Sequence, residues 1–121
     1  MKIKIIAQSS VAQGLESLGA PSRPLSTPAQ NMSGIEVHLD GVAENETGIW
    51  ECTPGRFERQ LTEAEVMHIL TGVCTFTPSD GEPLAIKSGD TLFFPRNTSG
   101  VWDIQETLRK VYVVFKPAGP T

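Results

Sequence analysis

Residues 55–72 read GRFERQLTEAEVMHILTG, and this stretch decides how the rest of the chain is interpreted. It contains two short runs, Arg56–Leu61 and Glu65–Thr71, separated by the polar corner Thr62-Glu63-Ala64. The turn pair Pro54-Gly55 precedes the first run and Gly72 ends the second, as turn residues bound strands. The stretch therefore predicts two short β-strands joined at a corner.

The same pattern extends outward in both directions. Ile35, Val37 and Leu39 alternate with Glu36 and His38, which is the period of a strand. On the other side, residues 78–81 (PSDG) predict a hairpin turn. The remaining predicted strands are Lys2–Ile6, Gly48–Thr53, Val73–Thr77, Leu84–Lys87, Thr91–Phe94, Gly100–Gln105 and Leu108–Phe115. Roughly ten short strands with regular turns are typical of an all-β sandwich or jelly-roll barrel.

Composition sets the class of protein. The chain has 121 residues, 39% of them hydrophobic, which suits one domain with one core. The net charge of −4 leaves no basic footprint, so we expect no nucleic-acid partner. No charge-free apolar stretch approaches the ~18 residues of a membrane span, and no signal peptide is visible. With two isolated cysteines, Cys52 and Cys74, the sequence indicates a cytoplasmic protein with small, reduced core thiols.

Residues 8–33 differ from the rest of the chain, being rich in Ser, Pro, Gly, Ala and Gln. We expect an extended arm that packs on the domain, with a short helix over Val11–Leu18 as the alternative. The predicted organisation is an N-terminal strand and arm (1–33), a barrel (34–115) and a C-terminal tail (116–121). The sequence has no internal repeat, so a second barrel is not expected.

Two stretches resemble the motifs of the cupin family. Glu65 and Gly72 match the E-x6-G end of the first motif, and Gly89 and Pro95 in GDTLFFPRN match G-x5-P of the second. The segments GIWECTPG (48–55), GVW (100–102) and ETLRKVY (106–112) are similar to small cupins grouped with ureidoglycine aminohydrolase and the ethanolamine-utilisation cupin. The resemblance covers residues 34–115 and implies a cupin-type double-stranded β-helix, that is, a single jelly-roll barrel.

The resemblance also implies where a metal would bind. Cupins with a metal hold it by two His and the Glu of the first motif and by the His of the second. Aligned on Glu65, the two His positions fall on Arg59 and Leu61, or on Glu58 and Gln60 with a longer gap, and the last falls on Gly100. Leu offers no donor atom and Arg is a cation without an acceptor. We therefore predict no metal and no other cofactor. The alternative is a bulge that brings Glu58, Gln60 and Glu65 together, an oxygen-rich set that could hold a hard cation weakly.

The two histidines of the chain do not replace the missing ligands. His68 lies three residues after Glu65, and successive side chains alternate across a strand. His38 is out of phase with Ile35, Val37 and Leu39. Both are therefore predicted to point away from the barrel interior, unless a bulge reverses one of them.

The same parity predicts the lining of an interior pocket. The predicted ligand-binding residues are Phe57, Arg59, Leu61, Glu65, Met67, Trp102 and Tyr112, with Glu65 as the catalytic candidate. Arg59 and Glu65 have two interpretations. They form an ion pair in the space of a lost metal, or Arg59 binds an anionic group of a ligand while Glu65 serves as an acid or base. Glu106, Arg109 and Lys110 are predicted to be solvated strand-end charges or a dimer contact.

Three functions are compatible with this sequence. The first is binding of a small anionic or amino-acid-like molecule without a His-ligated metal. The second is an enzyme, a hydrolase, lyase or isomerase acting on a small amide, ureide or amino-acid-like substrate, either with a metal, as the family resemblance implies, or without one. The third is a structural or regulatory module that forms a homodimer, since exposed strand edges are templates for pairing.

Overall fold

The computed structural model describes residues 2–42 and 44–116, which form eight strands and one short 3-10 turn. The predicted tail, 116–121, lies outside the described residues except for Lys116. The elements, in chain order, are η1 (Ser9–Val11), β1 (Glu16–Gly19), β2 (Met32–Val37), β3 (Glu46–Cys52), β4 (Gly55–Leu61), β5 (Ala64–Pro78), β6 (Leu84–Lys87), β7 (Thr91–Phe94) and β8 (Thr98–Phe115).

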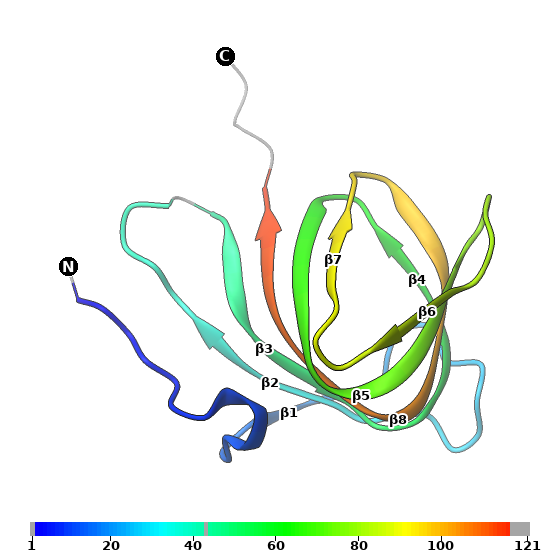
Figure 1. Ribbon diagram of the computed structural model, residues 1–121, viewed down its shortest axis with the longest axis horizontal. Helices are drawn as coiled ribbons and strands as arrows, with labels where there is room; N and C mark the ends of the chain where they lie inside the picture. Colours follow the sequence, from blue (N-terminus) through cyan, green and yellow to red (C-terminus); the bar gives the residue numbers. More distant parts are fainter. Residues whose placement is uncertain (1, 43, 117–121) are drawn as a thin grey trace.

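Two long strands organise the molecule (Figure 1). β5 and β8 run antiparallel from the pair Ala64 and Phe115 to the pair Pro78 and Gly100. The sequence predicted each of them as two shorter strands, which is wrong: both are continuous. The break at Gly72 is instead a bend, with register shifts between Ile69 and Cys74. Gly72 has φ +105°, and a Cβ there would lie 2.8 Å from Leu108 Cα, so only glycine fits this close approach.

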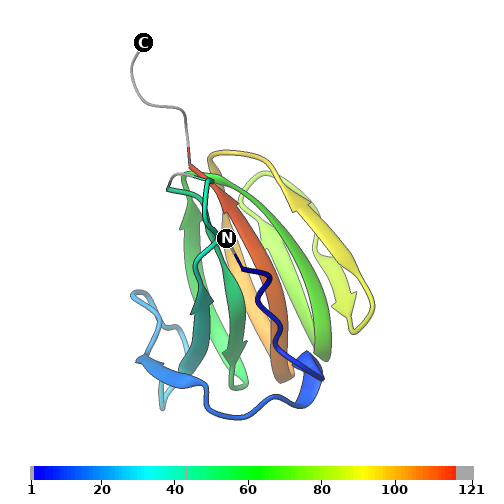
Figure 2. The same cartoon turned by 90° about the vertical axis from the view of Figure 1, so that its left-hand side faces the viewer.

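The bend divides the strands between two facing layers. In one layer the first half of β5 pairs with β7 and with the second half of β8. The second half of β8 pairs with β3, and β2 and then β1 follow beyond β3. The remaining halves pair with β4 and β6. The two layers curve around a common interior, most clearly seen when Figures 1 and 2 are compared. This is the jelly-roll barrel that the sequence predicted.

The interior is filled by the alternate residues that parity selected. Phe57, Met67, Ile69, Trp102 and Ile104 are all buried, as predicted. The rest of the buried core is Cys52, Cys74, Phe76, Ile86, Phe94 and Leu108. Burial of these side chains supplies the main driving force for folding, at about 25 cal/mol per Å² of apolar surface.

The N-terminal region departs from the sequence-based prediction. Lys2–Ile6 is not a strand, and Val11–Leu18 forms no helix but leads into β1, which pairs with β2. Further along, Leu25 N donates to Arg56 O (2.8 Å) and Glu58 N donates to Arg23 O (3.0 Å). The arm therefore covers the edge of β4 in its own chain, which blocks that edge from pairing with another molecule.

Among the described residues, no helix has the length and hydropathy needed to cross a membrane.

Candidate functional site

A cavity of about 210 Å³ lies between the two layers. Its walls come from β1 and β2, β3, β4, the start of β5 and both halves of β8. The lining residues are Leu18, Met32, Glu46, Trp50, Phe57, Arg59, Leu61, Glu65, Trp102, Lys110, Tyr112 and Val114. Six of the seven predicted ligand-binding residues are among them. The seventh, Met67, is fully buried beside the cavity instead of lining it.

The central feature of this cavity is a buried ion pair. Lys110 Nζ donates to Glu65 Oε2 at 2.8 Å, and the two residues are 9% and 4% exposed. The predicted pair between Arg59 and Glu65 is therefore wrong, because Glu65 takes its cation from β8. Arg59 forms no ion pair with any of the described residues, and its exposed side chain remains on the cavity wall.

Aromatic and sulfur atoms surround the ammonium group. Lys110 Nζ lies 4.8 Å from the ring centroid of Trp50 and 5.8 Å from that of Trp102, within the range of cation–π attraction. Met67 Sδ is 3.6 Å away. Burial lowers the pKa of Lys110, the carboxylate of Glu65 opposes that effect, and the positive charge of Arg59 lowers the pKa further.

The sequence contains a signal that identifies Lys110. Leu108, Lys110 and Tyr112 have the same parity, and they pair across β3 with Cys52, Trp50 and Gly48. Parity along one long β8 places Lys110 inside the barrel. The sequence-based prediction divided β8 into two shorter strands, which put the basic pair Arg109-Lys110 near a strand end. A charged pair near a strand end is expected to be solvated, and for this reason the prediction is wrong for Lys110.

Arg109 projects to the opposite face and is structural. Its Nε donates to Glu51 Oε1 at 3.0 Å, and Nη1 donates to the carbonyl oxygens of Ser9 and Ala12 at 2.8 Å each. This guanidinium fixes the η1 turn against β3. Lys110 and Arg109 are thus not solvated and do not form one cluster, so that part of the prediction is wrong for both. Glu106, the third residue of the predicted set, is exposed.

The residues at the cupin metal positions do not fit a metal ion. β4 pairs with β8 without any register shift, and Arg59 and Leu61 line the cavity whereas Glu58 and Gln60 do not, although Arg59 is exposed as well. Glu65 is already bonded to Lys110. At Gly100 a Cβ would lie 2.6 Å from Phe76 Cζ, so the phenyl ring fills the space of the fourth ligand. Donor atoms for a His-type site are therefore missing at three of the four positions.

Both histidines lie outside the cavity, as parity predicted. The side chain of His38 is 81% exposed. His68 Nδ1 lies 2.7 Å from Thr91 Oγ1 on the outer face of β5 and β7. Over residues 2–42 and 44–116, no group of three or more His, Cys, Asp or Glu side chains has the arrangement of a metal site.

The two thiols are core residues. Cys52 and Cys74 are free and buried, and burial raises the pKa of each to about 12. A thiol with such a pKa is protonated at neutral pH and is a poor nucleophile. This agrees with the sequence-based interpretation of both as small core side chains.

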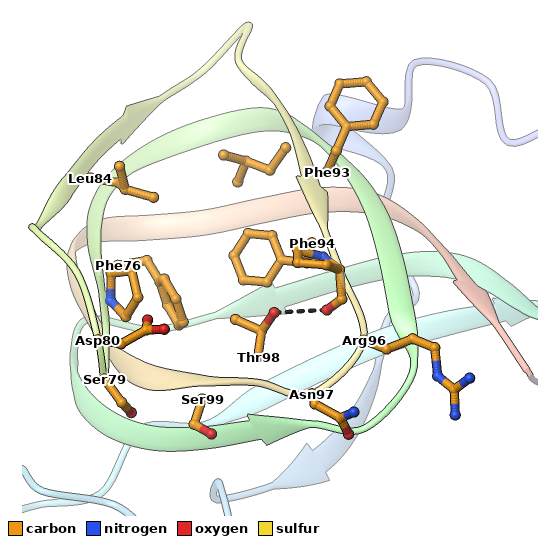
Figure 3. A pocket seen from close by; sticks show the side chains of 13 residues that line it. Phe76, Ser79, Asp80, Leu84, Phe93, Phe94, Arg96, Asn97, Thr98 and Ser99 are labelled. Atoms are coloured by element: carbon orange, nitrogen blue, oxygen red, sulfur yellow. Dashed lines mark hydrogen bonds between the residues drawn. The ribbon is translucent and has the colours of Figure 1, made fainter.

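A larger cavity, about 580 Å³, opens between the β5–β6 hairpin and the loop from β7 to β8 (Figure 3). Phe76 and Phe94 line it, and their rings pack on Trp102 with centroid distances of 4.8 and 5.7 Å. Phe76 and Phe94 thus pack against Trp102, which lines the smaller cavity. The guanidinium of Arg96 points away from the opening in Figure 3. The larger cavity contains no buried charge, whereas the smaller one holds the Lys110–Glu65 pair.

Comparisons with known proteins agree with this architecture. A putative ethanolamine utilization protein q from Salmonella typhimurium LT2 superposes with a TM-score of 0.67 at 23% identity, over 93% of this chain and 85% of its own. EutQ from Clostridium difficile superposes with a TM-score of 0.63 at 18% sequence identity, over 78% of this chain and 76% of its own. A Pseudomonas syringae pv. tomato protein of unknown function superposes with a TM-score of 0.76 at 23% sequence identity, over 88% of this chain and 46% of its own. The present chain thus spans about half of that last protein.

At these identities the similar structures establish the fold. No curated protein sequence matches the chain. The sequence profile of the EutQ-like cupin domain matches residues 40–112, which is more than half of the chain and includes β3 to β7 and most of β8. The chain therefore belongs to the family of EutQ-like cupin domains.

Proposed function

We propose that this cupin binds a small anionic or amino-acid-like molecule in the cavity between its two layers, without a His-ligated metal. The observation that carries the proposal is the buried Lys110–Glu65 pair at the wall of the cavity, together with Arg59 on the same wall. A buried ion pair costs free energy to desolvate and is weak support for stability alone. Retention of charged groups in a cavity is typical of a binding site.

Each charged group has a distinct role in this proposal. Arg59 forms no ion pair among the described residues, and its planar guanidinium is suited to a bidentate bond with a carboxylate. Lys110 adds a second positive charge, and Glu65 accepts a hydrogen bond from the ammonium group of an amino-acid-like ligand. Trp50 and Trp102 cover the apolar part. The volume of about 210 Å³ is below that of pockets for drug-sized molecules, so the ligand is a small metabolite.

Tryptophan fluorescence offers a direct test, because both tryptophans of the chain line this cavity. We expect saturable quenching by small carboxylates and amino acids, and none by the corresponding neutral amides. Arg59→Met should weaken binding about tenfold or more, as expected for loss of a charged hydrogen bond worth about 1.5–3 kcal/mol. Arg56→Met is the matched control, since Arg56 is exposed on the same strand and does not line the cavity. Equal affinities in both variants would contradict the proposal.

A second candidate is catalysis at the same place. Glu65 is buried and hydrogen-bonded to an amine, which is an arrangement suited to moving a proton. The similarity to the ureidoglycine aminohydrolase group supports a small amide, ureide or amino-acid-like substrate. If such turnover is found and Glu65→Gln leaves its rate unchanged, this candidate fails.

The third candidate, a homodimeric structural or regulatory module, is supported by the outer face of the β7–β5–β8 layer. Phe93 is 73% exposed there, beside Val66 and Phe115. Exposed apolar patches of this kind are a feature of protein interfaces. Sedimentation velocity on Phe93→Ser should then show a shift toward monomer relative to the unchanged chain, whereas a monomer in both would rule the module out.

A further inference from the structure

The amine of Lys110 is the one nucleophile placed in the small cavity among the described residues. The hydroxyl of Tyr112 also lines the cavity, but burial and nearby carboxylates raise its pKa, so it is protonated at neutral pH. Both thiols lie in the core and are absent from the cavity lining. Lys110 Nζ, by contrast, lies on the cavity wall at 2.8 Å from a carboxylate.

We infer that Lys110 forms a reversible imine with a small oxo acid, a molecule that carries both a carbonyl group and a carboxylate. This inference rests on the proposed anion-binding function, because Arg59 must hold the carboxylate while the carbonyl carbon faces the amine. It specifies the ligand class of that site and assigns it a covalent step.

Three features of the site support a reactive amine. Lysines that form imines are desolvated or lie near another cation, and Lys110 meets both conditions. It is 9% exposed, between the rings of Trp50 and Trp102, and the charge of Arg59 disfavours its protonation. Both burial and Arg59 lower its pKa, which increases the neutral fraction that attacks carbonyl carbon. Glu65 is within proton-transfer distance of the nitrogen.

The step is balanced with these groups alone. The ammonium group of Lys110 first gives a proton to Glu65. Neutral Nζ then attacks the carbonyl carbon, a C–N bond forms, and protonated Glu65 gives that proton to the carbonyl oxygen, which becomes a hydroxyl. The nitrogen of this carbinolamine loses a proton to Glu65. Protonated Glu65 then returns a proton to the hydroxyl, which leaves as water while the nitrogen lone pair forms the C=N bond. One water is released, and no oxidant or reductant is required.

Arg59 is the reason to expect an oxo acid in place of a simple ketone or aldehyde. It lines the same cavity as Lys110, and its exposed guanidinium has no ion-pair partner among the described residues. A bound carboxylate would be held in one orientation, which raises the effective concentration of the carbonyl group at Nζ. A neutral carbonyl compound of equal size lacks this anchor.

The test is reductive trapping of the intact chain with pyruvate and sodium cyanoborohydride, followed by peptide mass spectrometry. Exposed Lys87 in the same molecule gives the background. We expect labelling of Lys110 at least about tenfold above Lys87, because the cavity holds the carbonyl group at Nζ and raises its effective concentration there, whereas Lys87 is exposed and outside the cavity. Acetone, the neutral counterpart of pyruvate, should label Lys110 less, and Arg59→Met should remove the preference for pyruvate.

Two controls separate this inference from the proposed function. Lys110→Arg has no primary amine and should yield no adduct at position 110, whereas Lys87→Arg, at an exposed residue outside the cavity, should leave pyruvate binding and the labelling of Lys110 unchanged. If the unchanged chain binds pyruvate but Lys110 is labelled no more than Lys87, the imine is wrong and anion binding stands. If fluorescence responds to no small carboxylate, oxo acid or amino acid, and Lys110 is labelled no more than Lys87, both proposals fail.

Discussion

Lys110 and Glu65 determine the electrostatics of the cavity, and neither is stable there without the other. Removing one member of a buried ion pair leaves an uncompensated charge in a region of low dielectric constant. The pair joins β5 to β8, so it also links the two strands that form both layers. Its consequences are therefore measurable both in stability and in ligand binding.

We expect Glu65→Gln to lower the free energy of unfolding by about 3 kcal/mol, the size found when one partner of a buried pair is removed. The double variant Glu65→Gln with Lys110→Met should recover much of the loss, because no unpaired charge remains. Urea unfolding followed by circular dichroism measures both. Additive losses in the double variant would show that the two side chains do not interact.

The lowered pKa of Lys110 also predicts a pH dependence. Between its value in the folded chain and the ordinary 10.5, the unfolded state binds the proton and the folded state does not. The free energy of unfolding should therefore rise with pH through that window. Below the window both states bind the proton, and the full cost of the buried ammonium group remains. Lys110→Arg cannot titrate there, so the difference between the two proteins isolates the effect from Tyr112 and the other lysines. A difference that is constant with pH would contradict the assigned shift.

The strands illustrate which features the sequence determines. Alternation predicted that Phe57, Met67 and Trp102 face inward, because burial on one face specifies register. The sequence-based prediction missed that β5 and β8 are continuous. In β5 the reason is Gly72, because a glycine occurs both where a strand ends and where a strand bends. Lys110 was missed for a related reason, because a basic pair near a predicted strand end suggests a solvated position. Its partner on β5 is 45 residues away in the sequence.

The bend at Gly72 gives a prediction at the scale of the element. Gly72→Ala places a Cβ against the Thr107–Leu108 backbone at a positive φ, whereas Gly89 has a similar φ (+94°) and open space around it. Gly89→Ala should cost about 1–2 kcal/mol from the backbone conformation alone. Gly72→Ala should cost clearly more, measured as the shift in unfolding midpoint. Equal losses would show that the contact with β8 is not tight.

At the scale of the whole molecule, the barrel is a cupin whose interior cation is an ammonium group. Phe76 occupies the space beside Gly100 and packs with Phe94 and Trp102 in the barrel interior. The fold was predictable because its motifs contain glycine, proline and glutamate at fixed spacing. The contents of the cavity were only partly predictable, because they depend on pairs such as Lys110 and Glu65 that are formed across strands.

The barrel interior also predicts the reactivity of the thiols. Because burial raises the pKa of Cys52 and Cys74 to about 12, neither should react with Ellman's reagent in the folded chain. Both should react at once in denaturant. Rapid reaction of one thiol under native conditions would mean that the layers separate far more readily than the packing indicates.

Lys110 is the cation bonded to Glu65 in the cavity, and metal content tests, without any knowledge of the ligand, whether Glu65 binds a metal ion instead. Elemental mass spectrometry would be applied to untagged protein incubated in turn with Mn, Fe, Ni and Zn and then desalted. We expect metal far below stoichiometric amounts, with no difference between the unchanged chain and Glu65→Gln. Stoichiometric metal that is retained by the unchanged chain and lost in Glu65→Gln would show instead that Glu65 is a metal ligand.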